Sequence, residues 1–171
     1  IFTVTAQQFE EHIASLIQQG YGSINPDQVF AFLTQGKALP ERPIMITVDD
    51  GWRSNIDIML PVLEKYHFCS TIFVTTGPEA WIFRKFEGLD RGLTADEVRD
   101  LHRRGVSIGS HTVTHPYLIE MHDEEIRKEF LDSKRTLEAW TGVPCRFLSI
   151  PGNFYNRRIA QIAYECGYEA V

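Results

Sequence analysis

Two short clusters in the 171-residue sequence carry side chains that can bind a metal ion and transfer protons. Asp49 and Asp50 precede Gly51, and His111 stands four positions before His115. Two imidazoles and one carboxylate leave coordination positions open, as a catalytic ion requires. Such an ion lowers the pKa of bound water to about 7 and polarises a carbonyl group, which favours amide or ester hydrolysis. The second carboxylate could then serve as general base.

Each cluster, taken alone, has an ordinary structural explanation. In an isolated Asp-Asp-Gly sequence, one carboxylate commonly caps a helix, here near Ser54, while the other is solvated. Of two histidines four positions apart, one is more often buried and hydrogen-bonded while the other is exposed. Adjacent carboxylates oppose each other's ionisation unless a cation lies close by. The metal hypothesis therefore depends on whether the fold brings the two clusters together.

Short apolar, β-branched runs alternate with helical segments from residue 44 onward. Near-continuous apolar strands separated by helices predict an α/β fold with parallel strands. A doubly wound sheet and a (β/α) barrel share this alternation, and a complete barrel takes about 250 residues, so this chain could supply only part of one. Strands are predicted at 44–48, 71–74, 106–109, 146–150 and 168–171, and helices at 5–20, 25–36, 55–66, 94–104, 123–140 and 156–166.

The unusual polar clusters all follow predicted strands. Residues 49–51 follow the first of these strands, residues 110–116 follow the third, and residues 151–153 follow the fourth. In parallel β/α folds, ligand sites gather at the carboxyl ends of the strands. The sequence therefore predicts that the acidic and histidine clusters meet at one edge of the sheet and share an ion.

Three segments resemble the first three motifs of the polysaccharide deacetylase family, also called the NodB-homology domain or carbohydrate esterase family four. They are residues 47–51, 110–116 and 147–156. The resemblance implies a distorted, incomplete (β/α) barrel and a site for zinc, or for cobalt or nickel in some members. It assigns Asp49 as general base, Asp50, His111 and His115 as metal ligands, and the Gly152 backbone N–H as a donor to the oxyanion.

The resemblance also implies a substrate and a location. Family substrates are acetylated sugar polymers, chiefly the N-acetylglucosamine polymers chitin, peptidoglycan and poly-N-acetylglucosamine, which implies an extracytoplasmic protein. Trp52 could stack on a sugar ring or equally pack the barrel mouth. The substrate-binding candidates are Trp52, Pro151, Gly152 and Asn153.

Three other functions share parts of this pattern. A non-catalytic carbohydrate-binding domain would have the same motifs, and a small-molecule amidohydrolase could act on other carbon–nitrogen bonds with the same scaffold. A non-haem iron oxygenase also uses two histidines and one carboxylate, but the predicted parallel sheet argues against its all-β scaffold.

The sequence departs from the family pattern in two respects. Many relatives carry an arginine two residues before the proline of the third motif, where this chain has Ser149, and Arg146 lies too far along the strand to serve as a substitute. Relatives also have later motifs, including a histidine that acts as general acid. We therefore expect residues 1–171 to be one deacetylase domain lacking its C-terminal part, with the polypeptide continuing beyond Val171.

Composition narrows the choice of partners. The net charge of −6 disfavours nucleic acid, because phosphate binding needs an excess of Lys and Arg. We expect neither a membrane span nor a signal peptide within the sequence. Cys69, Cys145 and Cys166 lie in apolar stretches without close pairing and are predicted to be core thiols. The remaining histidines are predicted to lie at the surface: His12, His67, His102 and His122.

Overall fold

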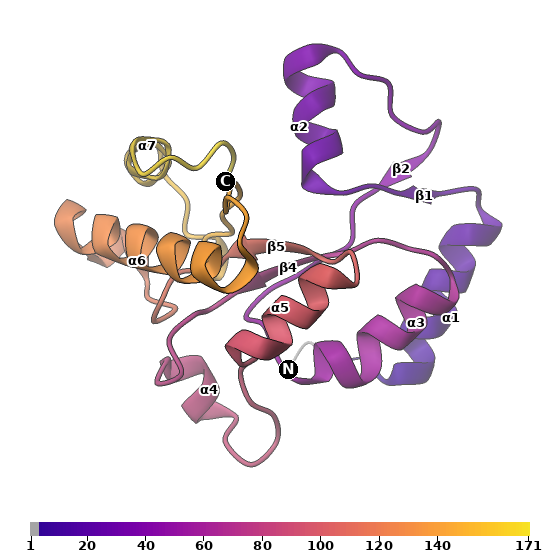
Figure 1. Ribbon diagram of the computed structural model, residues 1–171, viewed down its shortest axis with the longest axis horizontal. Coiled ribbons are helices and arrows are strands. Elements are labelled where there is room, and N and C mark those ends of the chain that lie inside the picture. The colour runs from indigo at the N-terminus through magenta and orange to yellow at the C-terminus, as the bar shows by residue number, and fades with distance from the viewer. Residues whose placement is uncertain (1–3) are drawn as a thin grey trace.

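Three parallel strands form the sheet that carries the predicted site residues. The computed structural model describes residues 4–171, and in it β3 (Thr47–Val48), β4 (Thr71–Val74) and β5 (Ser107–Ser110) pair in that order (Figure 1). Every residue of β4 is buried, as expected for a central strand whose two faces are both covered. The prediction of an α/β fold with parallel strands is confirmed.

The order of pairing is that of part of a (β/α) barrel. Beyond β5, single parallel bridges join Ser110 to Leu148 and Phe147 to Ala170, so successive segments of the chain lie side by side. A barrel places consecutive units next to each other, whereas a doubly wound sheet reverses direction at a switch point. The sheet described here contains no such reversal between residues 47 and 170.

Three predicted strands differ in the structure. The run 44–48 divides, because Ile44 accepts a hydrogen bond from Ile24 whereas Ile46 accepts one from Thr71. As a result β2 (Pro43–Ile44) pairs with β1 (Gly22–Ser23) in a separate two-stranded sheet, and only β3 joins the main one. The predicted strands 146–150 and 168–171 form isolated bridges only, Ser110 with Leu148 and Phe147 with Ala170.

The predicted helices form, with one altered turn and one addition. The first turn of the predicted helix 55–66 is a π-helix (η1, Asn55–Met59), followed by α3 (Leu60–Lys65), whose Pro61 has no N–H to donate. Helix α4 (Trp81–Lys85) was not predicted. The other helices are α1 (Ala6–Gln18), α2 (Pro26–Gln35), α5 (Ala95–Arg103), α6 (Asp123–Thr141) and α7 (Arg157–Glu165), with single 3₁₀ turns η2 (Leu118–Glu120) and η3 (Pro151–Asn153).

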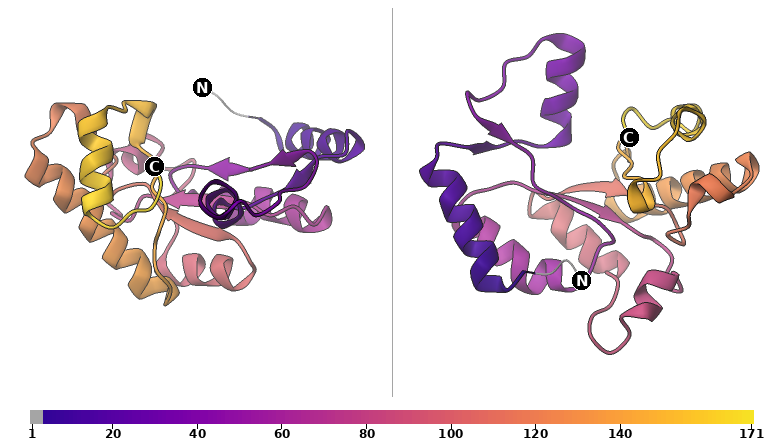
Figure 2. Two further views of the ribbon diagram at one scale, coloured as in Figure 1. Left: turned by 90° about the horizontal axis from the view of Figure 1, so that it is seen from above. Right: turned by 180° about the vertical axis from the view of Figure 1, so that it is seen from behind.

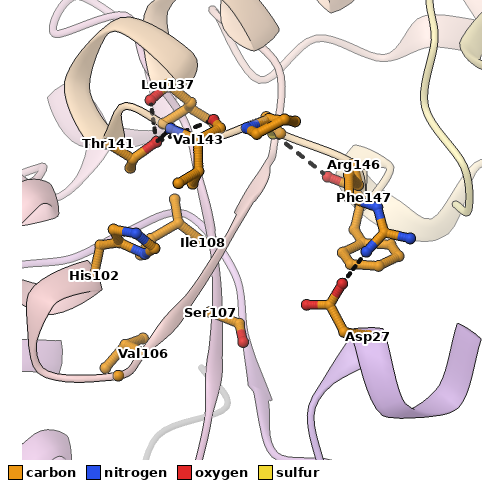
Figure 3. A pocket seen from close by; sticks show the side chains of 13 residues that line it. Asp27, His102, Val106, Ser107, Ile108, Leu137, Thr141, Val143, Arg146 and Phe147 are labelled. Atoms are coloured by element: carbon orange, nitrogen blue, oxygen red, sulfur yellow. Dashed lines mark hydrogen bonds and ion pairs between the residues drawn. The ribbon is translucent and has the colours of Figure 1, made fainter. Parts of the chain in front are cut away.

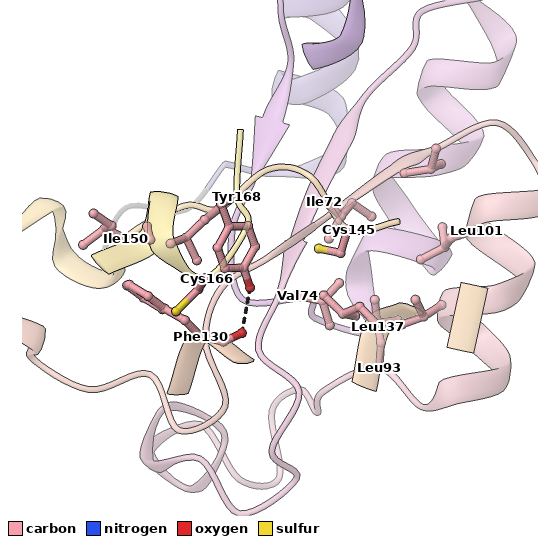
Figure 4. Close-up of a cluster of buried hydrophobic side chains, with 14 of the residues drawn as sticks. Ile72, Val74, Leu93, Leu101, Phe130, Leu137, Cys145, Ile150, Cys166 and Tyr168 are labelled. Carbon is pink, nitrogen blue, oxygen red and sulfur yellow. Dashed lines mark hydrogen bonds between the residues drawn. The ribbon is translucent and has the colours of Figure 1, made fainter. Parts of the chain in front are cut away.

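Helices cover the sheet and enclose one main core. Figures 1 and 2 show α3, α5 and α6 along the sheet, α1 beside α3, and α2 standing beyond the two-stranded sheet. Ile72 and Val74 of β4 pack with buried side chains of α5 and α6 (Figure 4). The Tyr168 hydroxyl donates to the Phe130 carbonyl at 3.0 Å. No helix within residues 4–171 has the length and apolar character needed to cross a membrane.

The cysteine and most of the histidine predictions are confirmed. Cys145 and Cys166 are buried, Cys69 is half-buried, and all three are free thiols. Burial raises the pKa of the Cys145 thiol to about 12. Among the other histidines, His102 is half-buried and the remaining three are exposed: His12, His67 and His122.

Glu97 joins α5 to the loop that follows the acidic pair. Its carboxylate accepts hydrogen bonds from the guanidinium groups of Arg91 and Arg53 and from the Thr94 N–H, and the pKa of Glu97 is consequently held well below 4.5. A carboxyl whose pKa is lower in the folded state stabilises the fold above its unfolded pKa of about 4.3, and this contribution declines as the pH falls further.

We therefore expect Glu97→Gln to reduce the free energy of unfolding by about 1–3 kcal/mol at pH 7. Urea unfolding of both proteins at pH 7 and below pH 4 measures the effect, and the difference should shrink at the lower pH. Glu41→Gln is the matched control, because Glu41 is exposed. Equal stabilities of the wild type and Glu97→Gln at pH 7 would contradict this role.

Candidate metal centre

The three predicted ligands meet at the carboxyl end of the sheet. Asp50 follows β3, and His111 and His115 follow β5. The Asp50 Oδ1 atom lies 3.5 Å from His111 Nε2 and 3.2 Å from His115 Nε2, and one ligand atom from each residue lies within 4.8 Å of the others. Two ligands bound at about 2.0–2.1 Å to a tetrahedral zinc ion lie roughly 3.3 Å apart. The spacing therefore suits a single ion.

Two buried polar atoms at this point lack hydrogen-bond partners. Asp50 Oδ1 and His115 Nδ1 are both inaccessible to solvent and have no partner among residues 4–171. His111 is 99% buried. A buried carboxylate oxygen without a donor is costly, and a bound cation removes that cost. Together with two nitrogen ligands and one oxygen ligand, this arrangement fits a divalent metal ion.

Neighbouring groups orient two of the ligands. His111 Nδ1 lies 2.8 Å from the Ser149 carbonyl oxygen, which can only accept, so the proton sits on Nδ1 and Nε2 faces Asp50. The Trp52 indole N–H donates to Asp50 Oδ2 at 2.9 Å and leaves Oδ1 toward the imidazoles. Each contact fixes the atom that would bind the ion.

The backbone is unusual at the same positions. Asp50 has φ 70° and His115 has φ 58°, in the left-handed region that non-glycine residues rarely adopt. The Asp50 carbonyl accepts a hydrogen bond from the Thr75 N–H at 3.0 Å, and the His115 N–H donates to Thr112 Oγ1 at 3.2 Å. Such conformations gather at functional sites, where surrounding contacts maintain them.

The electrostatics favour the protonation states that bind metal. Burial raises the pKa of Asp50, but the neighbouring His115 imidazole, the charge of His111 and the hydrogen bond from Trp52 outweigh it, so the net pKa is lowered. Burial lowers the pKa of His111, against the opposing charges of Asp49 and Asp50. A carboxylate at Asp50 and a neutral imidazole at His111 are the forms in which these two groups bind metal.

Asp49 lies beside this cluster without belonging to it. Its side chain is exposed, and its charge is the largest influence favouring the protonated form of His111. The structure thus separates the two adjacent carboxylates as predicted, one in the cluster and one outside it.

Comparison with known proteins identifies the family. The family model for polysaccharide deacetylase matches residues 36–171. The protein YxkH of Bacillus subtilis (strain 168) is 30% identical over 97% of this chain. This chain belongs to the polysaccharide deacetylase family.

Two further relatives extend the comparison. The peptidoglycan-N-acetylglucosamine deacetylase of Bacillus cereus is 34% identical over 43% of this chain and 34% of its own length. The structure of the Streptococcus pyogenes deacetylase PplD, in complex with acetate, shares the fold with a TM-score of 0.85 and 24% identity over 96% of this chain and 70% of its own. The chain spans 57% of the length of YxkH.

The third motif of this deacetylase-family chain forms the 3₁₀ turn η3. Pro151 is buried, whereas Gly152 and Asn153 are exposed and both have positive φ, 68° and 57°. The φ of 68° and a Cβ approach of 3.0 Å to the Phe154 ring both disfavour a side chain at residue 152. The turn follows Ser149, whose carbonyl holds His111, so it lies next to the metal centre. Its contact with substrate stays a prediction.

Trp52 packs within the protein. Its ring meets Phe83 and Phe86 edge-on, with centroid distances of 5.0 and 5.5 Å. The half-buried indole thus packs against α4 and hydrogen-bonds Asp50. Of the two roles considered for Trp52, sugar stacking and packing within the protein, the structure shows the second. Sugar stacking by Trp52 stays a prediction.

Sequence reasoning missed Trp81. Its indole N–H donates to the His115 carbonyl at 2.6 Å, and its ring meets the His115 imidazole edge-on at 5.4 Å. Trp81 begins the unpredicted helix α4, where Ala80 makes no side-chain cap. No local pattern relates residue 81 to residue 115, so only the fold reveals the contact.

Arg146 forms its ion pairs at a distance from Asp49 and Asp50. Its guanidinium binds Asp27 and Glu169 and helps line a pocket of about 170 Å³ near Ser107, the first residue of β5 (Figure 3). This pocket is therefore at the opposite end of the strand from His111. The arginine found in many deacetylase relatives at position 149 has no replacement in Arg146, as the sequence predicts.

Proposed function

We propose that this protein is a metal-dependent hydrolase that removes acetyl groups from N-acetylglucosamine residues of an acetylated polysaccharide. The observation that carries the proposal is the convergence of Asp50, His111 and His115 on one point, with the exposed Asp49 carboxylate beside them. Family membership and the peptidoglycan substrate named for the Bacillus cereus relative support the same reaction.

Each group at the site has a separate role in the proposed hydrolysis. Zinc, or cobalt or nickel, held by the three ligands would lower the pKa of water toward about 7 and polarise the acetyl carbonyl. Asp49 takes the proton from the attacking water as general base. The Gly152 N–H donates a hydrogen bond to the carbonyl oxygen as that oxygen gains negative charge.

Aromatic side chains beside the centre favour a carbohydrate substrate. Trp81 stacks on Tyr117 with 25° between the ring planes, and Tyr117 meets Phe154 at 5.5 Å. Tyr117 is 48% exposed and Phe154 is 44% exposed, so part of their ring surface is available to a ligand. The C–H faces of pyranose rings pack well on such surfaces. We propose an extracytoplasmic location, where the cell-envelope polymers lie.

The test is acetate release from acetylated chitooligosaccharides and peptidoglycan fragments by the purified protein. We expect a chelator to abolish release and added zinc or cobalt to restore it. Release that a chelator leaves unchanged would contradict the metal mechanism. Sugar binding without release would indicate a non-catalytic carbohydrate-binding domain, and hydrolysis restricted to small amides would indicate an amidohydrolase of other substrates.

A further inference from the structure

The carboxylate of Glu129 on α6 binds the turn that carries His115. Its Oε2 accepts the backbone N–H groups of Val113 at 2.7 Å and Thr114 at 2.9 Å, and its Oε1 accepts the Thr114 hydroxyl at 2.7 Å. Glu129 is half-buried. One charged group on a helix therefore receives three donors from a single turn, fifteen and sixteen residues earlier in the chain.

This turn has a backbone that needs such support. Thr112 has φ 68°, which is costly for a β-branched residue. On one side, the carbonyls of Thr112 and Val113 accept hydrogen bonds from the N–H groups of Thr76 and Gly77, at 3.1 and 2.9 Å. Glu129 binds the N–H groups on the other side. Without the carboxylate, the two N–H groups of Val113 and Thr114 would lose their partners.

The same face of α6 also contacts the start of the histidine segment, residues 110–115. Ser133, one helical turn after Glu129, lies with its Oγ 2.8 Å from Ser110 Oγ. Ser110 immediately precedes His111, and its own Oγ accepts the Thr112 N–H at 3.3 Å. Helix α6 thus contacts the histidine segment both before His111 and before His115.

His115 depends on its backbone more than His111 does. The His111 ring is oriented by the Ser149 carbonyl, whereas His115 Nδ1 has no hydrogen-bond partner among the described residues. The His115 imidazole is therefore placed by the turn from which it projects and by its edge contacts with Trp81 and His111. A shift of the turn would move this ligand directly.

We infer that Glu129 is a positioning residue of the metal centre, which sets the His115 imidazole in place by fixing the turn 112–115. The inference rests on the proposed metal site. The hydrogen bonds of Glu129 go to Val113 and Thr114 and to none of the three ligand side chains, so it acts through the turn. Residues that orient metal ligands typically change affinity by about 10–100-fold when they are replaced.

The experiment compares zinc affinities of Glu129→Ala, Glu129→Gln and the wild type by competition with a chromogenic chelator. We expect Glu129→Ala to bind zinc about 10–100-fold more weakly. Glu129→Gln should lose less, because its amide oxygen can still accept both backbone N–H groups. Glu124→Gln is the matched control, since Glu124 is an exposed residue in the first turn of the same helix, and its affinity should equal that of the wild type.

Thermal unfolding of the metal-free proteins separates positioning from general stability. A lower melting temperature of Glu129→Ala with unchanged zinc affinity would overturn the inference. If that variant does not fold, Glu129→Met decides, because methionine keeps the length of the side chain but has no oxygen to accept the two N–H groups. Wild-type affinity in Glu129→Met would likewise overturn the inference. A wild-type protein that binds no zinc, cobalt or nickel would reject the metal centre itself, whereas normal binding by Glu129→Ala or Glu129→Met would reject only the role of Glu129.

Discussion

Replacing His115 with alanine is expected to abolish stable metal binding, and with it acetate release. His115 Nε2 is one of three atoms that face a common point, and its loss leaves only Asp50 and His111 as protein ligands. We expect affinity to fall by more than the roughly 100-fold typical of losing an outer-shell partner. His111→Ala should have the same effect. Metal content after dialysis, measured by inductively coupled plasma mass spectrometry, provides the test.

The control for these variants is His12→Ala, because His12 is exposed on α1, far along the chain from the site. It should retain the wild-type metal content. Circular dichroism spectra must show that the His115 variant is folded, and His115 suits this purpose because its side chain is 13% exposed whereas that of His111 is 2% exposed. One equivalent of metal retained by a folded His115→Ala protein would rule out this ligand set.

Replacing Asp49 with asparagine should keep the metal and lose most of the turnover. Asp49 lies outside the ligand cluster, so the amide leaves Asp50, His111 and His115 in place. An amide cannot accept a proton from water at neutral pH, and general base catalysis typically contributes about 10²–10⁴-fold to the rate. We therefore expect kcat to fall by that factor with metal content unchanged.

Two comparisons make this result specific. Asp50→Asn should lose metal as well as activity, because it weakens a ligand, and Glu41→Gln, at an exposed position, should change neither. Turnover measured at saturating zinc separates lost chemistry from lost metal. An Asp49→Asn protein with wild-type kcat would remove Asp49 from the mechanism.

The meeting of the three ligands could be predicted because one topological rule applies to all of them. Asp50 and the two histidines each follow a predicted strand, and parallel strands bring their carboxyl ends to one edge. Helix starts are likewise encoded by nearby residues, since Thr5 and Asn25 each form a capping box with the glutamine three positions later. These features depend on residues close together in the chain.

The features that sequence reasoning missed depend on distant partners. The run 44–48 has a uniform β-strand pattern, yet its two ends pair with different sheets. Trp81 and Glu129 touch the His115 segment across 34 and 15 residues, with no periodicity to reveal the contact. Strand 146–150 was predicted at full length because its composition says nothing about where the neighbouring strand ends.

The hydrogen bond between His111 and residue 149 has an evolutionary consequence. The acceptor is a main-chain oxygen, which every amino acid possesses, so natural substitutions at this position leave the orientation of the histidine intact. The side chain at position 149 can therefore vary independently of the orientation of the metal ligand His111. A serine or an arginine at this position would thus offer His111 Nδ1 the same main-chain acceptor.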